Sequence, residues 1–400
     1  MQKIVMTLVL LFLAGFGTAY AFDADEIEIH GFASTGYMKT DQNNYLLRSE
    51  DGSFEFNEAG LNVTTSLNEN IRVGMQLFSR DLGSVGNNDV KLDWAFLDYQ
   101  WKEALGLRVG RIKTPMGLHS DTRDYDMLRT SILLPQGVYN EYFREAEIAY
   151  QGAAVYGNIA LGSGGRFGYD IYAGAVEIKP DGIMAKYMSD ADAVLTSATI
   201  DRMAGGRIRW YTPLQGLMLG STLQQLAMNV DFESPSAPVY MNWDVPTMQF
   251  LYLSAEYDLG SWTFAAEYFR WKSDATTSVD MSRLEQPNPP PLEEIVDSDS
   301  YYVLLAYRVT DWFEAGAYYN AFYYDRDDRD GDFAVAEGVP DYYAWQKDLA
   351  LSLRFDVTDS WLVKLEAHVM DGVHLLDYAE NPDGVEQDWM LFAVKTTFNF

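Results

Sequence analysis

Charged side chains alternate with apolar ones along several stretches of this sequence, in an arrangement that would place them around water. Within a strand, all positions of one parity share a face of the sheet. If the opposite, apolar face contacts lipid, the charged face must contact water, because Arg or Lys at mid-bilayer costs about 2–4 kcal/mol. The basic candidates for the water face are Arg72, Arg207, Arg209, Arg308, Arg354, Lys364 and Lys395, and the acidic ones are Asp170, Glu256, Glu267, Glu314, Asp348 and Glu366. Opposed charges would order water and favour small polar solutes. The alternative is a solvated wall whose charges only pair with each other.

A long segment between two predicted strands, about 114–146, carries a second group of charges. The members of this group are Asp121, Arg123, Asp124, Asp126, Arg129 and Arg144. A loop of this length is rarely structureless in a compact protein. Its apolar residues, such as Leu133 and Leu134, could pack against the inner wall of a channel formed by the strands. We therefore expect the segment to fold into this channel and to narrow it with its charged side chains. The alternative is an external loop that packs between subunits.

The strand that precedes this segment gives a conflicting pattern. Arg111 and Lys113 share the parity of the apolar residues Leu107 and Val109, which would direct them towards lipid. A kink or bulge at Gly110 would turn them inward. We assign both residues to the water-facing side of the sheet, and the only reason is that their exposure to lipid would cost free energy.

Few residues have the types and spacing required for catalysis or metal binding. The neighbours His119 and Ser120 could form part of a nucleophilic site, but ordinary loop composition explains them better. Of the other histidines, His30, His368 and His374, His368 lies beside Glu366 on a predicted wall. We find no H-E-x-x-H zinc motif and no Cys, and Arg326 and Arg329 interrupt the acidic run 325–332, unlike an EF-hand loop. We expect neither an enzyme nor a cofactor or metal site.

The chain is strongly acidic, with a net charge of −30. This charge argues against nucleic acid as a partner. Much of the acid lies in predicted loops, near 293–299 and 325–332. Acidic loops at the mouth of a pore raise the local concentration of cations, and they could also bind divalent cations that bridge to lipopolysaccharide.

The elements that would position these residues are strands. In 349–355 and 361–369, apolar residues occupy every second position, which no amphipathic helix would produce. About sixteen such stretches occur, near 27–38, 54–67, 71–80, 90–101, 106–113, 147–158, 164–176, 204–211, 216–229, 247–257, 261–273, 300–309, 313–325, 347–356, 360–371 and 387–400. Short connections alternate with long ones, near 39–53, 81–89, 114–146, 177–203, 230–246, 274–299, 326–346 and 372–386.

The alternating strands and the alternation of short with long connections predict an all-β fold. The fold expected is a transmembrane antiparallel β-barrel with short periplasmic turns and long extracellular loops. A β-sandwich also has many short strands, but it would not segregate the loop lengths in this way. Sixteen strands leave an aqueous channel in a barrel. The abundant aromatic residues, 14% of the chain, are typical of girdles at both membrane interfaces.

The two ends of the chain agree with a barrel. Lys3, an apolar run to about Gly15 and the small residues Ala19 and Ala21 have the pattern of a signal peptide. We therefore expect a signal peptide over 1–21 and the barrel over 22–400. The alternative, a membrane anchor, requires about 20 apolar residues. The last strand places Phe392, Val394 and Phe398 towards lipid and ends on Phe400.

Together with Val109-Gly110-Arg111-Ile112-Lys113-Thr114-Pro115-Met116-Gly117, these features resemble Gram-negative outer-membrane porins over the whole mature chain, and the nonapeptide looks most like the phosphate-selective O/P type. The resemblance implies a homotrimer whose third loop folds into the lumen, passive diffusion of small hydrophilic solutes and ions, and recognition of the terminal Phe by the barrel-assembly machinery. The acidic loops favour a weak cation preference, whereas the O/P resemblance implies anions. A substrate-specific channel for phosphate or a carboxylate, and a structural barrel or adhesin, remain as alternatives.

Overall fold

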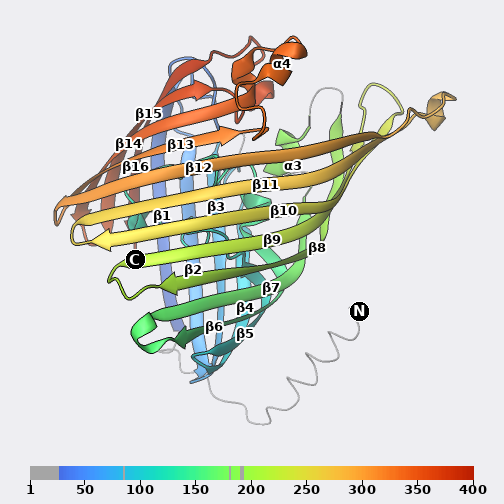
Figure 1. Cartoon of the computed structure of the whole chain (residues 1–400). Coiled ribbons are helices and arrows are strands. Elements are labelled where there is room, and N and C mark those ends of the chain that lie inside the picture. Colours follow the sequence, from blue (N-terminus) through green and yellow to red (C-terminus); the bar gives the residue numbers. More distant parts are fainter. Residues whose placement is uncertain (1–26, 84–85, 180–181, 190–192) are drawn as a thin grey trace.

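Sixteen antiparallel strands form a closed barrel in which each strand pairs with the next along the chain (Figure 1). The computed structural model describes residues 27–83, 86–179, 182–189 and 193–400, so the predicted signal peptide lies outside the described residues. The prediction of an all-β barrel with about sixteen strands is confirmed. The strands are β1 Ile27–Thr40, β2 Phe56–Asn68, β3 Ile71–Leu82, β4 Lys91–Lys102, β5 Leu105–Lys113, β6 Ala149–Ala160, β7 Arg166–Ile178, β8 Val194–Tyr211, β9 Leu217–Glu233, β10 Tyr240–Leu259, β11 Trp262–Asp280, β12 Leu292–Thr310, β13 Phe313–Tyr323, β14 Trp345–Thr358, β15 Trp361–Gly372 and β16 Asp388–Asn399.

The first and last strands close the barrel. In this ladder Thr35 pairs with Thr396. Beyond it, Phe400 and Gly31 exchange two backbone hydrogen bonds of 3.0 Å. A Cβ added to Gly31 would come within 2.5 Å of the Phe400 ring, so glycine permits this close contact. The hydrophobic C-terminal strand is therefore paired on both sides and presents no free edge.

The inner and outer faces of the wall differ in polarity. In β14, Leu349, Leu351 and Leu353 are exposed on the outside, whereas Ser352 and Arg354 are buried on the inside. Exposed apolar residues recur at alternate positions of the other strands. A continuous apolar outer face of this kind suits the hydrocarbon region of a membrane.

Exposed aromatic residues lie on the outer face next to the short turns. Trp262 packs on Tyr307 with ring centroids 4.3 Å apart, and Trp361 stacks on Phe398 at 5.3 Å. The arrangement is that of an aromatic girdle at a membrane interface. The tryptophans of this girdle are Trp101, Trp210, Trp262, Trp312 and Trp361.

The five strands β8 to β12 are longer than predicted. They contain 18, 17, 20, 19 and 19 residues and extend towards the upper right of Figure 1, beyond the rest of the barrel. The predicted loops 177–203, 230–246 and 274–299 were therefore wrong in part, because each contains strand residues. In these extensions polar residues occupy both faces, as in Thr276, Thr277 and Ser278, so the alternation that marks a lipid-facing strand is lost.

Short helices lie in the connections, and the apolar cores lie inside the barrel. Two of these cores include residues of the segment between β5 and β6, such as Leu133 and Tyr139. Among the described residues, no helix is long and apolar enough to cross a membrane. The helices are η2 Asp126–Leu128, α2 Arg144–Glu147, η3 Gly162–Gly164, α3 Ile183–Tyr187, η4 Ser282–Leu284, α4 Asp332–Ala336, η5 Asp341–Ala344 and η6 Tyr378–Glu380.

Gly110 distorts β5 without a shift of register. Its φ is +128°, and the pairing of β5 with β4 continues through it from Val109 to Arg111. Of the kink or bulge expected at Gly110, the bulge does not occur in the pairing with β4, and a register shift lies instead between β3 and β4, after Gln76. This shift turns the adjacent residues Asp93 and Trp94 both into the buried interior.

Replacing Gly110 with Ala is expected to destabilise the barrel by about 1–3 kcal/mol, the usual cost of a strained backbone conformation. A Cβ at this position would also collide with the carbonyl oxygen of Ala95. Urea unfolding in lipid vesicles, followed by tryptophan fluorescence, would measure the loss. In the control Gly206→Ala, the nearest atom to the new Cβ is the Asp170 carbonyl oxygen at 3.4 Å. Equal stability of the two variants would contradict the assignment of strain to Gly110.

Candidate functional site

The segment 114–148, called L3 below, crosses the lumen and is bound to the inner wall. On one side of the barrel its main contact is Glu267 of β11. One carboxylate oxygen of Glu267 accepts the backbone N–H of Leu118 at 2.9 Å, and the other accepts hydrogen bonds from the hydroxyls of Tyr139 and Tyr302. On β13, Asn320 accepts the N–H of Gly137 at 3.0 Å. These bonds hold L3 against the wall near its start, at Leu118, and in its second half, at Gly137 and Tyr139.

The middle of L3 is bound to β14 and β15. The Glu366 carboxylate accepts the backbone N–H groups of Ile132 and Leu133 at 2.7 and 2.8 Å. Lys364, which is fully buried, donates to the carbonyl oxygens of Asp126 and Ser131 at 2.7 and 2.9 Å. The wall charges therefore satisfy backbone groups of L3 that would otherwise be buried without partners.

Asp126 lies at the centre of a buried cluster of charges. Its carboxylate is 2.8 Å from Lys395, 3.0 Å from Arg129 and 3.7 Å from Lys364, and it accepts the Thr397 hydroxyl at 2.8 Å. Burial alone would raise the pKa of Asp126, but Lys395 and Lys364 outweigh this effect and hold the pKa well below its usual value. Asp126 is thus an ionised link between L3 and β15 and β16. Arg354 of β14 adds a hydrogen bond of 2.6 Å to the carbonyl oxygen of Met127.

A second buried cluster ties the end of L3 to β4. Arg144, in α2, is 3.1 Å from Asp93 and 2.6 Å from Asp124. Arg123 pairs with Glu141 at 3.2 Å and Glu147 at 3.1 Å within L3 itself. All six side chains pair within the protein, so this part of L3 presents few free charges to a solute.

Arg111 and Lys113, at the end of β5, contact residues of the same buried cluster or residues next to it. Lys113 donates to the carbonyl oxygen of Asp121 at 3.1 Å and lies 3.5 Å from the Asp124 carboxylate. Arg111 donates to the backbone oxygen of Asp93 at 2.8 Å. Both side chains are only partly buried, and both contact protein groups at the base of L3.

Three of the predicted residues keep substantial exposure. The side chains of Arg72, Asp121 and Arg209 are 51%, 40% and 31% exposed. Arg207, in contrast, is buried between Asp121 at 2.7 Å and Asp170 at 3.1 Å. Most of the fourteen predicted constriction residues thus bind L3 to the wall or pair with each other, and of these fourteen Arg207 and Arg209 also line a cavity.

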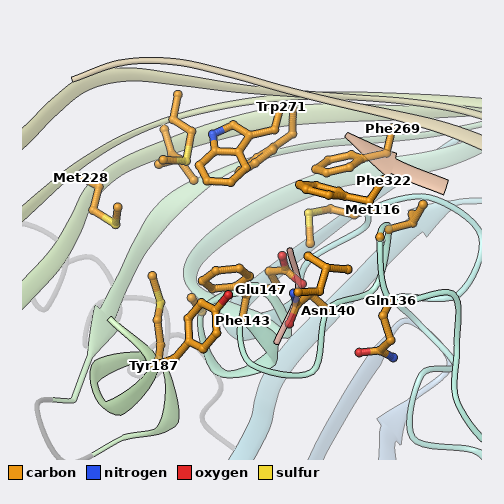
Figure 2. A pocket seen from close by; sticks show the side chains of 18 of the residues that line it. Met116, Gln136, Asn140, Phe143, Glu147, Tyr187, Met228, Phe269, Trp271 and Phe322 are labelled. Carbon is orange, nitrogen blue, oxygen red and sulfur yellow. The ribbon is translucent and has the colours of Figure 1, made fainter. Parts of the chain in front are cut away.

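The space left beside L3 lies against β8, β9 and β10 and has two compartments. Near the short turns, a small polar cavity of about 140 Å³ is lined by Arg207, Arg209 and Glu256. Nearer the long loops, along the same three strands, a larger cavity of about 300 Å³ is lined mainly by methionines and aromatic residues (Figure 2). The turn of L3 at 116–118 separates them, because Met116 lines the larger cavity and Gly117 and Leu118 line the smaller one. A solute that crosses the barrel here must pass this turn.

Sequence reasoning missed the larger cavity and the role of Asp93. The cavity is built from residues that were assigned to loops or to ordinary strand faces, such as Met184, Trp243 and Met248. Register shifts in β8 after Ile200 and in β10 after Val245 turn residues three apart into the same interior. A strict alternation of faces cannot reveal such positions, and only the high methionine count, 16, could have pointed to them.

The candidates for catalysis and metal binding have structural partners instead. The His119 ring packs on Tyr139, with centroids 5.5 Å apart, and burial lowers the pKa of His119 to about 4. The Ser120 hydroxyl accepts the N–H of Met116 at 2.8 Å. Within the acidic run, Asp328 accepts the N–H groups of Asp332 and Phe333 at the start of α4. Among the described residues, no three His, Asp or Glu side chains are grouped as metal ligands would be.

Solved barrels from outer membranes share this fold. OmpT of Vibrio cholerae, folded in vitro, is 13% identical with a TM-score of 0.57, and the match covers 96% of this chain and 100% of that one. Salmonella typhi OmpF in complex with daunomycin is 13% identical, with a TM-score of 0.58 and coverage of 95% and 99%. The anion-selective porin from Comamonas acidovorans is 13% identical, with a TM-score of 0.55 and coverage of 94% and 99%.

Neither the comparison with models of protein families nor that with curated proteins gives a match. At these identities the likeness to the solved barrels shows the fold alone. The chain has the closed sixteen-stranded architecture of outer-membrane porins and channels.

Proposed function

We propose that this protein is an outer-membrane porin that lets small hydrophilic solutes and ions diffuse across the membrane. The observation that carries this proposal is the space beside L3, where two cavities lie along β8 to β10 inside a closed barrel with an apolar outer face. A packed barrel would have no such space, and a barrel of this strand number leaves room for water. The fold of the solved porins supports the same function. The proposal includes a signal peptide over 1–21, insertion of the barrel into lipid and lipopolysaccharide, recognition of Phe400 by the barrel-assembly machinery, and no catalytic step.

A liposome swelling assay tests this proposal. Purified full-length protein in multilamellar liposomes should admit arabinose faster than the larger sugar raffinose, because a narrowed channel discriminates by size. Folded protein that gives no swelling with either sugar would contradict the proposal and would favour a structural barrel or adhesin.

We propose a preference for cations within this function. The inner arginines near the short turns are each beside a carboxylate, as in Arg72 with Asp98, Arg209 with Asp170 and Arg308 with Glu314. The chain as a whole is strongly acidic. The alternative of an anion-specific channel is weakened by three further arginines. Arg123, Arg144 and Arg207 are buried, and each pairs with a carboxylate of the protein.

Reversing the charge of Arg72 is expected to strengthen the cation preference. Arg72 is half exposed and lies 3.9 Å from Asp98, so Arg72→Glu would replace a positive charge of the inner wall with a negative one, while Asp98 keeps Arg108 at 3.1 Å. The reversal potential under a KCl gradient should shift towards the potassium potential, most clearly below about 0.1 M salt, where screening is weak. The matched control is Lys102→Glu, an exposed residue that lies over Trp101 at a short turn. Equal shifts in both variants would show that Arg72 does not face the ion path.

We further propose that three copies assemble into a homotrimer, as in the porins that the sequence resembles. Chemical cross-linking of intact membranes should give a product of three times the mass of one chain. A product limited to single chains, under conditions that cross-link a known trimeric porin in the same membranes, would contradict this assembly.

A further inference from the structure

We infer that the larger cavity is a binding site for a small, uncharged, mostly apolar molecule, such as a compound with one or two aromatic rings. This inference deepens the proposed function, because the cavity lies on the proposed path of solutes. Its volume of about 300 Å³ is at the lower end of the range of small-molecule sites. We call it the methionine cavity below.

The walls of the methionine cavity are mainly apolar. Five methionines line it, namely Met116, Met184, Met188, Met228 and Met248, together with the eight aromatic residues Phe143, Tyr187, Trp243, Phe250, Phe269, Trp271, Phe322 and Tyr324. Figure 2 shows Met116, Met228, Phe143 and Trp271 around the same space. Methionine side chains are flexible and polarisable, so they adapt to ligands of different shape and make favourable contacts with aromatic rings.

The polar groups in the lining are engaged with the protein. Glu147 pairs with Arg123 at 3.1 Å, so its charge is compensated from within L3. Gln224 accepts the Tyr172 hydroxyl at 2.9 Å, and His374 contacts the backbone oxygen of Tyr343 at 2.8 Å through Nδ1. Water in such a cavity has few partners, and its displacement by an apolar ligand is favourable by about 25 cal/mol for each Å² buried. An anion or a free cation would find no opposite charge that is available.

The lining includes one buried hydrogen-bond donor that has no protein partner in the described part of the chain. The indole Nε1 of Trp271 is buried, and it has no hydrogen-bond partner among the described residues. A buried donor without a partner costs about 1–3 kcal/mol. A ligand with a hydroxyl or carbonyl oxygen beside its apolar part would therefore bind more tightly than a pure hydrocarbon.

Register shifts in two strands beside the cavity help to form its wall. In β8, Ile200 and Met203 are three residues apart, and both are buried inward because the register shifts after Ile200. In β10, Val245 and Met248 have the same relation across a second shift. Bulges frequently lie next to binding sites, where they redirect side chains. Here Ile200 and Met248 line the cavity, and Met203 and Val245 belong to the same apolar core.

Binding of 2-naphthol to full-length protein in lipid nanodiscs tests the inference. The probe is uncharged at pH 7 and carries one hydroxyl, and 2-naphthalenesulfonate is its anionic counterpart. Equilibrium dialysis against empty nanodiscs should show saturable binding of one 2-naphthol for each chain, and binding of the sulfonate at least about tenfold weaker. No saturable binding above that of empty nanodiscs, or equal binding of the two probes, would overturn the inference.

Variants locate the site. Met228→Trp fills the cavity and should weaken 2-naphthol binding at least about tenfold, whereas Met75→Trp, on the exposed outer face of β3, should leave it unchanged. Trp271→Phe removes the free donor, keeps an aromatic ring at this position and should weaken binding about threefold to tenfold. This variant carries the test if Met228→Trp fails to fold. Equal binding by Met228→Trp and Met75→Trp, or no effect of Trp271→Phe, would contradict the assignment.

The same preparation separates this inference from the proposed function. Swelling of liposomes without binding of 2-naphthol would overturn the methionine cavity as a site and leave the channel intact. Binding without swelling would support the site and contradict free diffusion through the barrel.

Discussion

Replacing Asp126 with Asn is expected to release L3 from the wall. Asp126 is the shared partner of the fully buried Lys364 and the almost fully buried Lys395. Removing one member of a buried ion pair costs about 3–5 kcal/mol, because the remaining charge has lost its compensation. Lys395 keeps Glu58, so the loss is expected mainly at Lys364 and along the segment 126–132 that it holds.

Limited trypsin digestion of the folded barrel measures this release. In the wild-type protein Arg123 is buried and Arg129 is largely buried, so cleavage within L3 should be slow. In Asp126→Asn, cleavage after Arg129 should be at least about tenfold faster. The control Asp330→Asn changes an exposed residue of the acidic run and should behave as the wild type. Unchanged protection of L3 in Asp126→Asn would contradict the central role of this carboxylate.

The second large effect is expected at Arg144. Arg144→Met would leave the buried carboxylates of Asp93 and Asp124 without their common partner. The expected loss is about 3–5 kcal/mol in the free energy of unfolding, measured by urea titration of the protein in lipid vesicles. Arg144→Lys should lose less, because it keeps the charge but not the two-pronged geometry of the guanidinium.

Two further variants show whether charge is the cause. Adding Asp93→Asn and Asp124→Asn to Arg144→Met removes the unpaired charges and should restore part of the lost stability. Arg48→Met breaks an ion pair with Glu380 at an almost fully exposed side chain and should cost less than about 1 kcal/mol. If Arg144→Met cost no more than Arg48→Met, the buried cluster would not fix L3.

The barrel could be predicted from the sequence because lipid imposes a strict alternation on each strand. Leu349, Leu351 and Leu353 alternate with polar residues, and the strand β14 appears where this pattern does. The upper parts of β8 to β12 could not be predicted in the same way. There both faces contact water or protein, and in stretches such as Thr276 to Ser278 apolar residues do not alternate with polar ones.

The site was less predictable than the fold, for two physical reasons. Parity places a charge such as Glu366 on the inner face, but it does not tell whether a solute or L3 will be its partner. Only the folded chain shows that the amides of Ile132 and Leu133 take both oxygens of Glu366. Register shifts such as the one after Val245 also break the alternation of faces on which the prediction depends. For this reason the methionine cavity could not be predicted from the sequence.

Single-channel recording in a planar lipid bilayer tests the central claim most directly. The wild-type protein should insert in discrete ohmic current steps, and the reversal potential under a KCl gradient should have the sign of a cation preference. This result would establish an open passage beside L3 that is governed by acidic groups. Folded, inserted protein that gives no current steps would contradict the account, because it would mean that L3 closes the lumen.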